Sequence, residues 1–190
     1  MVFFHNADIY PSPYPQKGAH HAVYMISVFA KACLQYLASR NIVPSVFVTN
    51  DWFPGLCPAY AKVGHFGDMF KETCFMHICH NLQETYEGRI HLDPRLEGLK
   101  EVHGLPNDFL IDPSWGNRMV NPSRCAIMLS DQWATVSKSY RDEIMNGSSL
   151  SWLLRQKTNP FAFPNGIPIK ERLKKMDAVA PDHLTAKRML

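Results

Sequence analysis

The chain has 190 residues, of which 46% are hydrophobic and 19% are charged, so it can bury the core of one large domain. A formal net charge of +3 is too small to indicate nucleic acid as a partner, and we expect none. The longest apolar runs are interrupted by Lys, Gln or Asn, so we expect neither a membrane-spanning segment nor a membrane partner.

Cysteine usage and the first residues indicate a compartment. The chain has five cysteines, an odd number, scattered through apolar surroundings. This pattern is typical of reduced thiols in a cytosolic protein rather than of a disulfide framework. Residues 1–6 lack the basic start and the small-residue cleavage site of a signal peptide. We therefore expect a cytoplasmic location.

Segments typical of strands and of helices alternate along the chain. In the first half the pattern predicts, in order, a strand over residues 2–5, a helix over 20–40, a strand over 45–50, a short helix over 53–63 and a strand over 73–79. In the second half it predicts a helix over 121–129, a strand over 132–136, a helix over 138–145, a helical turn over 152–156, a strand over 159–164 and two helices within 168–190. This alternation predicts an α/β fold, with a mostly parallel sheet covered by helices on both faces.

Residues 82–120 interrupt the alternation. They are rich in Gly, Pro, Asp and Asn and show no clear period. A segment of this length without regular structure is usually functional or mobile in a compact domain. We therefore predict a long irregular loop here.

A polar group stands at the end of the best strand pattern. Residues 46–50 suit a buried strand, and they lead directly into Asp51 and Trp52 by way of Asn50. In an open α/β sheet, ligands bind outside the carboxyl ends of the strands, so this strand end is a candidate site. The alternative is that Asp51 caps the helix that follows and that Trp52 packs in the core.

The same arrangement recurs at three later strand ends. His80 and Asn81 follow the strand over 73–79, Ser137 follows the next strand, and Asn165 and Gly166 follow the last. Each has a structural alternative: a core histidine, a helix cap at Ser137, or a simple Asn-Gly turn. A helix that begins after Ser137 would also suit an anion such as a phosphate.

A metal site and several cofactor motifs are poorly supported. Cys74, His77, Cys79 and His80 lie within seven residues. Successive side chains of a strand point to opposite faces, so these four groups cannot converge on one ion, and we predict no metal site. The sequence contains no G-x-G-x-x-G after the first strand, no phosphate-binding P-loop and no G-x-S-x-G, so we expect no bound cofactor.

A series of motifs then follows in a recognisable order. The motifs are Ser12-Pro13-Tyr14, the segment VTNDWFPGLCPAY at residues 48–60, His80-Asn81-Leu82, the segment LSDQWATVSKSYRDEI at 129–144, and Pro164-Asn165-Gly166-Ile167. They resemble S-P-Y, N-D-W-H-T-G-L-x-P-x-Y, H-N-L, A-D-x-[IV]-T-[AT]-V-S-P-x-Y-A-x-E-I and L-N-G-[IV]-D of the glycogen and starch synthases of glycosyltransferase family 5. The resemblance spans about residues 10–167.

The resemblance implies a GT-B architecture, in which two Rossmann-like domains enclose the active site. It implies retaining transfer of glucose from a nucleotide sugar, ADP- or UDP-glucose, to the non-reducing end of an α-1,4-glucan, without a metal. Residues 1–167 would form most of the N-terminal, acceptor-side domain, with the irregular loop at about 82–120. Residues 168–190 would be a linker or the start of the C-terminal domain. The family's first strand, its K-x-G-G-L loop and its second domain are not in the sequence, so we expect this chain alone to be inactive.

The motif match also assigns roles to residues. It implies that Asp51 and His80 are catalytic. It implies that a further set binds substrate: Tyr14, Asn50, Trp52, Asn81, Ser137, Asn165 and Gly166. The chain departs from the family where Phe53 replaces a histidine and where His20 and His21 replace an Asp-Asn pair. These departures leave an alternative, a non-catalytic glucan-binding or regulatory module derived from the same domain.

Overall fold

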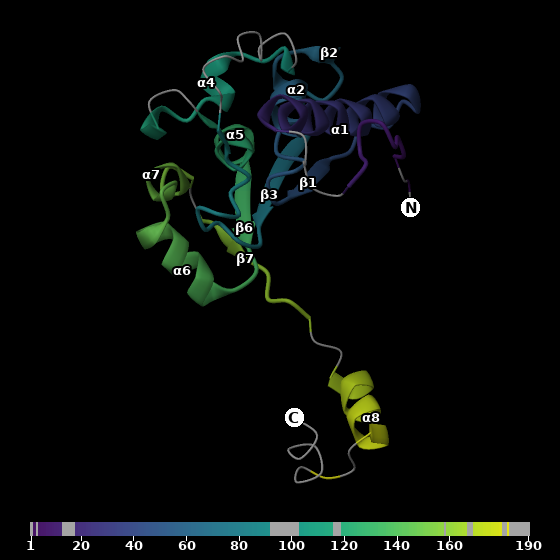
Figure 1. Ribbon diagram of the computed structural model, residues 1–190, viewed down its shortest axis with the longest axis vertical. Helices are drawn as coiled ribbons and strands as arrows, with labels where there is room; N and C mark the ends of the chain where they lie inside the picture. The colour runs from purple at the N-terminus through teal and green to yellow at the C-terminus, as the bar shows by residue number, and fades with distance from the viewer. Residues whose placement is uncertain are drawn as a thin grey trace.

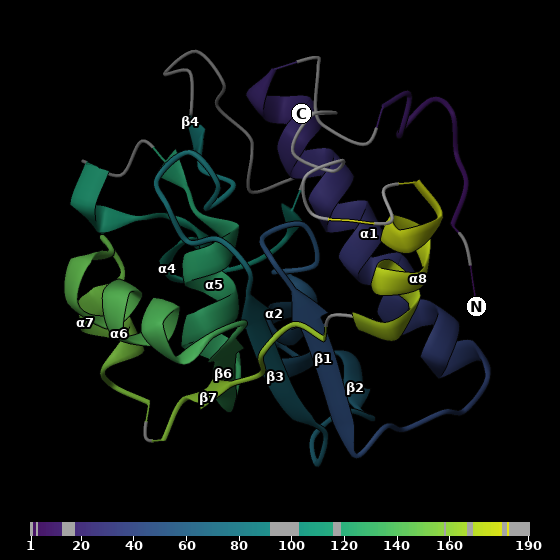
Figure 2. The same cartoon turned by 90° about the horizontal axis from the view of Figure 1, so that it is seen from below.

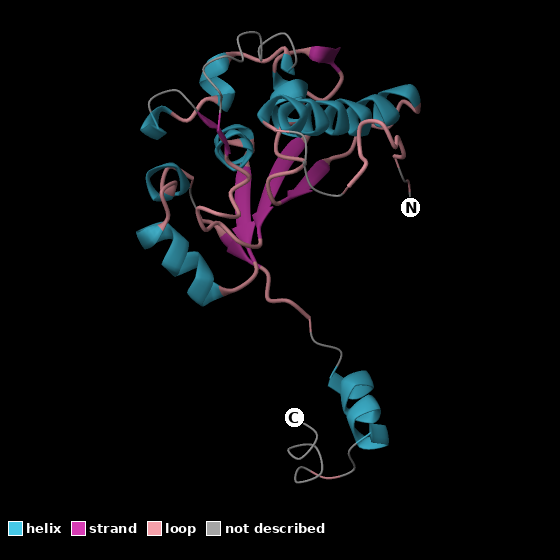
Figure 3. Ribbon diagram, viewed as in Figure 1, coloured by secondary structure: helices cyan, strands magenta, loops and turns pink. Residues whose placement is uncertain are grey.

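The computed structural model describes residues 2, 4–12, 18–91, 103–115, 119–157, 159–166, 169–179 and 182. Within them a parallel sheet of four strands lies at the centre, in the order β1-β3-β6-β7 (Figure 1; Figure 3). These strands are β1 (Val46–Asn50), β3 (Cys74–Cys79), β6 (Gln132–Thr135) and β7 (Phe161–Ala162). The predicted α/β fold is confirmed.

Helices α1 (Ala19–Ser39), α2 (Cys57–Lys62) and α5 (Pro122–Leu129) build the main core against one face of the sheet. α1 buries the apolar stripe that its helical spacing predicts, including Val23, Ile26, Ala30 and Leu34. The fully buried ring of Tyr60 on α2 joins this cluster. α1 is the one described helix whose length and apolar composition would suit a membrane span, and its buried stripe belongs to this core.

The opposite face of the sheet is exposed at β1 and partly buried at β3. Val46 and Val48 of β1 point to it, and their exposed fractions are 51% and 46%. Figure 2 views this side of the sheet and shows β1 and β3 in front of α2. At the other end of the sheet, α6 (Lys138–Gly147) and α7 (Ser151–Leu154) share a second core cluster with the buried Trp133 of β6.

The segment predicted as a long irregular loop contains short regular elements. Its described part includes β4 (Ile90–His91), α4 (Asn107–Leu110), the 3₁₀ turn η1 (Pro113–Trp115) and β5 (Met119–Val120). β4 and β5 pair antiparallel to each other. The prediction of an irregular loop was wrong for these parts, because elements of two to four residues are too short to show a period.

Other boundaries also differ from the prediction. Val2, Phe4 and His5 are not in a strand; the Phe4 ring instead packs edge-on against Phe29 and Tyr36 of α1. The helix expected from residue 53 begins at Cys57, because residues 52–57 form tight turns first. The short strand β2 (His65–Asp68) was not predicted.

α8 (Ile169–Val179) confirms the first of the two helices expected near the end of the chain, and the second falls largely outside the described residues. Figure 1 shows α8 apart from the rest of the molecule, at the end of the segment that follows β7. Ile169 and Leu173 are exposed.

Asp131, which precedes β6, connects this strand to β3 near the amino ends of both. Its Oδ2 accepts a hydrogen bond from the Phe75 N–H at 2.8 Å, and its Oδ1 lies 3.1 Å from Lys62 Nζ. Partial burial by itself would raise the pKa of this carboxyl. The Phe75 N–H and the ammonium groups of Lys62 and Lys157 outweigh burial, so the pKa of Asp131 lies below its ordinary value of 3.8.

This lowered pKa predicts a pH dependence of folding. The unfolded chain binds the proton of Asp131 more tightly than the folded chain does. The stability that the ionised carboxylate contributes is therefore present above about pH 4 and is lost as the pH falls through the folded-state pKa. We expect the melting temperature to fall below about pH 4 and the variant Asp131→Asn to show a shallower fall. Thermal unfolding followed by circular dichroism measures both, with the exposed Asp68→Asn as control. Equal slopes for the two variants would contradict this assignment.

Candidate functional site

The carboxyl ends of β1 and β3 meet at one edge of the sheet and bring three predicted site residues together. The Asp51 N–H donates to the Ile78 carbonyl at 3.0 Å, which continues the β1–β3 pairing by one residue. The Asp51 Oδ1 accepts a hydrogen bond from the His80 N–H at 2.8 Å. His80 Nε2 lies 3.0 Å from Asn50 Oδ1. The two strand ends are therefore joined through side chains as well as backbone.

Asp51 does not cap a helix. α2 begins at Cys57, and its N-cap residue, Leu56, makes no capping hydrogen bond with its side chain. Asp51 has a backbone φ of 55°, in the left-handed region that Asp tolerates better than most residues. Its carboxylate is committed to the backbone after β3, so the capping alternative was wrong.

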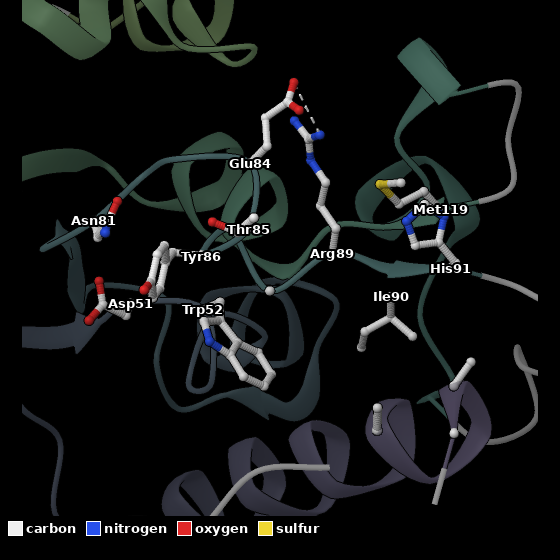
Figure 4. Close-up of a pocket in the computed structure, with 14 residues that line it drawn as sticks. Asp51, Trp52, Asn81, Glu84, Thr85, Tyr86, Arg89, Ile90, His91 and Met119 are labelled. Carbon is white, nitrogen blue, oxygen red and sulfur yellow. Dashed lines mark ion pairs between the residues drawn. The ribbon is translucent and has the colours of Figure 1, made fainter. Parts of the chain in front are cut away.

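A cavity of about 900 Å³ opens beside these residues. Asp51, Trp52 and Asn81 line it, together with the start of α1, Met119 of β5 and parts of residues 84–91 (Figure 4). We call residues 81–91 the pocket loop. Figure 4 shows Asp51 and Tyr86 toward one end, Trp52 beside them, and His91 and Met119 toward the other end.

The pocket loop packs closely against the Trp52 ring. Gly88 has a φ of 70°, and a Cβ added to it would lie 2.3 Å from Cγ and Cδ2 of the Trp52 ring. The indole also packs edge-on against Phe53, at 5.3 Å between ring centroids. Trp52 thus contributes both to the margin of the core and to the wall of the cavity.

The remaining predicted site residues lie in different places. Asn81 lines the cavity, whereas Ser137 caps α6 by accepting the Tyr140 N–H at 3.1 Å. The Tyr140 hydroxyl lies 3.4 Å from Asn81 Oδ1, so the capped helix end reaches the pocket loop. Asn165 and Gly166 follow β7, are exposed and do not line the cavity. Tyr14 lies outside the described residues.

The Cys- and His-rich strand β3 has the alternating geometry that the sequence predicts. Its residues alternate between partly and fully buried positions. His77 is buried on the core side, with Nδ1 at 2.8 Å from Thr49 Oγ1. Burial lowers the pKa of His77 to about 3, so it is a neutral core histidine at pH 7.

A buried polar network behind the pocket loop was not predicted. Glu87 is fully buried, and its Oε2 accepts from Arg89 Nε at 2.7 Å and from Asn121 Nδ2 at 3.1 Å. Its Oε1 accepts from Ser149 Oγ at 2.7 Å. The Asn121 amide also donates to Asp112 Oδ2 at 3.0 Å. The available sequence signal was a pair of opposite charges on either side of one glycine, Gly88.

Comparisons with known proteins agree on one family. The sequence model of the family described as the starch synthase catalytic domain matches residues 1–156. The glycogen synthase of Lachnospira eligens is 27% identical over 189 residues, which cover 96% of this chain and 38% of that protein. The glycogen synthase of Exiguobacterium sibiricum is 32% identical over 123 residues, 62% of this chain and 24% of that protein. The chain thus spans well under half the length of these relatives.

A solved structure has a similar fold. The catalytic domain of starch synthase IV from Arabidopsis thaliana, bound to ADP and acarbose, superposes with a TM-score of 0.65. It is 22% identical and is matched over 88% of this chain and 32% of its own. The family model covers most of the sequence, and the strands it spans carry the site described above. The chain therefore belongs to the glycogen and starch synthase family and carries part of its catalytic domain.

Proposed function

We propose that this chain is the acceptor-side part of a retaining glucosyltransferase. The reaction transfers glucose from a nucleotide sugar to the non-reducing end of an α-1,4-glucan. The relatives named above are synthases, so the alternative of a non-catalytic module is not favoured. Because the ADP of the Arabidopsis structure is an adenine nucleotide, ADP-glucose is the first donor to test and UDP-glucose the second.

The observation that carries the proposal is the cavity at the carboxyl ends of β1 and β3. Ligands of open α/β sheets bind at this edge. The cavity combines aromatic surface from Trp52 and Tyr86 with polar groups from Asp51 and Asn81. An aromatic ring packs on the apolar face of a pyranose, while carboxylate and amide groups accept and donate hydrogen bonds to its hydroxyls. This mixture suits an oligosaccharide.

Asp51 and His80 have distinct roles in this proposal. The Asp51 carboxylate holds the His80 backbone, and Asn50 fixes the imidazole through Nε2. A ring held in this way can direct a hydrogen bond to the sugar that is transferred. Such a bond accelerates the reaction if it strengthens in the transition state. The proposed catalytic residues are thus Asp51, which lines the cavity, and His80, which is bonded to it beside the cavity.

We extend the proposal to the cellular location of the protein, which we expect to be the cytoplasm. The five cysteines are all free, which supports a reducing environment such as the cytoplasm.

Binding of a malto-oligosaccharide tests the acceptor site directly. We expect maltoheptaose to bind this chain in isothermal titration calorimetry and Trp52→Ala to weaken binding by at least about tenfold. Trp152→Ala is the matched control, because Trp152 lies on α7, is 44% exposed and does not line the cavity. Equal losses in the two variants would contradict a site at Trp52.

A glucosyl-transfer assay tests the reaction. We expect no transfer by this chain alone, and transfer from ADP-glucose to glycogen by a protein that continues it through a second domain. If the longer protein binds glucan but transfers no glucose from either donor, the enzymatic proposal is wrong.

A further inference from the structure

The pocket loop is fixed from behind by a buried ion pair. Glu87 is fully buried, and the side chain of Arg89 is 6% exposed. Buried charges are costly unless they are paired and hydrogen-bonded, and here every acceptor oxygen of Glu87 has a partner. The Arg89 Nη2 donates to Ser149 Oγ at 2.6 Å, so serine and ion pair form one closed unit.

This unit is anchored to rigid parts of the domain. Asn121 caps α5 by accepting the Arg124 N–H at 2.9 Å, and the same side chain donates to Glu87. Ser123, in the first turn of α5, donates to the Glu87 carbonyl at 2.8 Å. The positive end of the α5 dipole also favours the carboxylate. Ser149 adds the turn between α6 and α7, so two separate segments, this turn and the start of α5, determine where Glu87 lies.

Gly88, which lies between Glu87 and Arg89 in the sequence, makes the contact with Trp52. The Gly88 backbone lies against the indole so closely that no Cβ would fit. Figure 4 shows the Arg89 side chain pointing toward Glu84, away from Trp52, and Arg89 Nη1 lies 3.6 Å from Glu84 Oε1. The charged side chains thus face the body of the domain, while the backbone between them faces the ring.

We propose that Glu87 and Arg89 are positioning residues, which hold Gly88 against Trp52 and so fix the indole as a surface for a sugar ring. The effect on sugar affinity rests on the proposed function, whereas the effect on the indole does not. If the ion pair served stability alone, its loss would lower the melting temperature and leave the environment of Trp52 unchanged.

The test measures the environment of the Trp52 ring and the affinity for the sugar separately. The chain is labelled with 5-fluorotryptophan, the Trp52 signal is assigned with Trp52→Phe, and maltoheptaose affinity is measured by calorimetry. We expect Glu87→Gln and Arg89→Gln each to shift or broaden the Trp52 fluorine signal and to weaken maltoheptaose binding about tenfold. Ser149→Ala, which removes one partner of each charge, gives a milder version of the same change in a protein that folds.

Two further variants separate position from stability. The double variant Glu87→Gln/Arg89→Gln leaves neither member of this ion pair buried without the other, so it regains part of the melting temperature lost by the single variants, yet its affinity stays low. Leu34→Ala empties a fully buried site on the far part of α1. We expect it to lower the melting temperature but to leave the Trp52 signal and the affinity unchanged.

The outcomes distinguish this inference from the proposed function. If the wild-type chain binds maltoheptaose, but the Glu87, Arg89 and Ser149 variants keep its affinity and its Trp52 signal, the inference is overturned and the function stands. If the wild-type chain binds no malto-oligosaccharide, the proposed function fails. In that case a moved Trp52 signal still supports the positioning of the ring, and an unmoved signal overturns it.

Discussion

Replacing Gly88 by Ala destabilises the domain by about 3 kcal/mol or more and weakens maltoheptaose binding at least about tenfold. Two costs add. An L-residue at a φ of 70° is strained, and its Cβ would lie 2.3 Å from the Trp52 ring, so the indole or the pocket loop has to move. Chemical denaturation gives the stability and calorimetry gives the affinity.

Gly64→Ala is the matched control for this prediction. Gly64 has a nearly identical φ of 74°, but nothing lies within 4 Å of its added Cβ. The backbone strain is therefore the same, about 1 kcal/mol, and the clash is absent. We expect unchanged sugar binding. If the two alanine variants lost equal stability, the contact between Gly88 and Trp52 would not have the importance that the structure gives it.

The second large effect is expected at Asp51. Asp51→Ala removes the acceptor of the His80 N–H and places Ala at a φ of 55°, which together cost about 2–4 kcal/mol. In a protein that continues through a second domain, we expect the transfer rate to fall about 100-fold, because the His80 backbone is no longer held. Thermal unfolding and a glucosyl-transfer assay measure the two effects.

Asp51→Asn separates the shape of this side chain from its charge. Asn tolerates the left-handed region, and its amide oxygen can still accept the His80 N–H. We expect stability within about 1 kcal/mol of the wild type. A rate close to that of the wild type would assign Asp51 a holding role, and a rate as low as that of Asp51→Ala would assign the charge a direct role. Full activity of the alanine variant would remove Asp51 from the site altogether.

The central sheet could be predicted because its strands and long helices carry clear patterns. The strand over Val46–Asn50 and the apolar stripe of Ala19–Ser39 are each long enough to show their period. The expectation that this strand is buried was wrong for one of its faces, because Val46 and Val48 are exposed. The rule that ligands bind at the carboxyl ends of parallel strands then placed Asp51 and His80 together, and their backbone and side chains do meet. Their catalytic roles stay predictions.

The buried network around Glu87 could not be predicted because it depends on contacts between distant segments. Charged residues in an irregular segment are normally exposed, so the opposite charges on either side of Gly88 do not by themselves indicate that Glu87 is buried. Its partners lie 34 residues away at Asn121 and 62 residues away at Ser149. A network of this kind appears only when the chain has folded and the helix ends at α5 and α6 are in place.

The pocket loop is held both at its start and at Glu87, and this spacing has a consequence for motion. At its start, the preceding His80 N–H is bonded to Asp51 and the Tyr140 hydroxyl lies beside Asn81, and further on the carboxylate of Glu87 is buried. Between them, Gln83 to Tyr86 form a turn held largely by local hydrogen bonds, and Tyr86 is 58% exposed. Segments of this kind open at low free-energy cost and exchange amide hydrogens quickly. The rim at Tyr86 therefore opens more readily than the part of the cavity wall where Gly88 packs against Trp52.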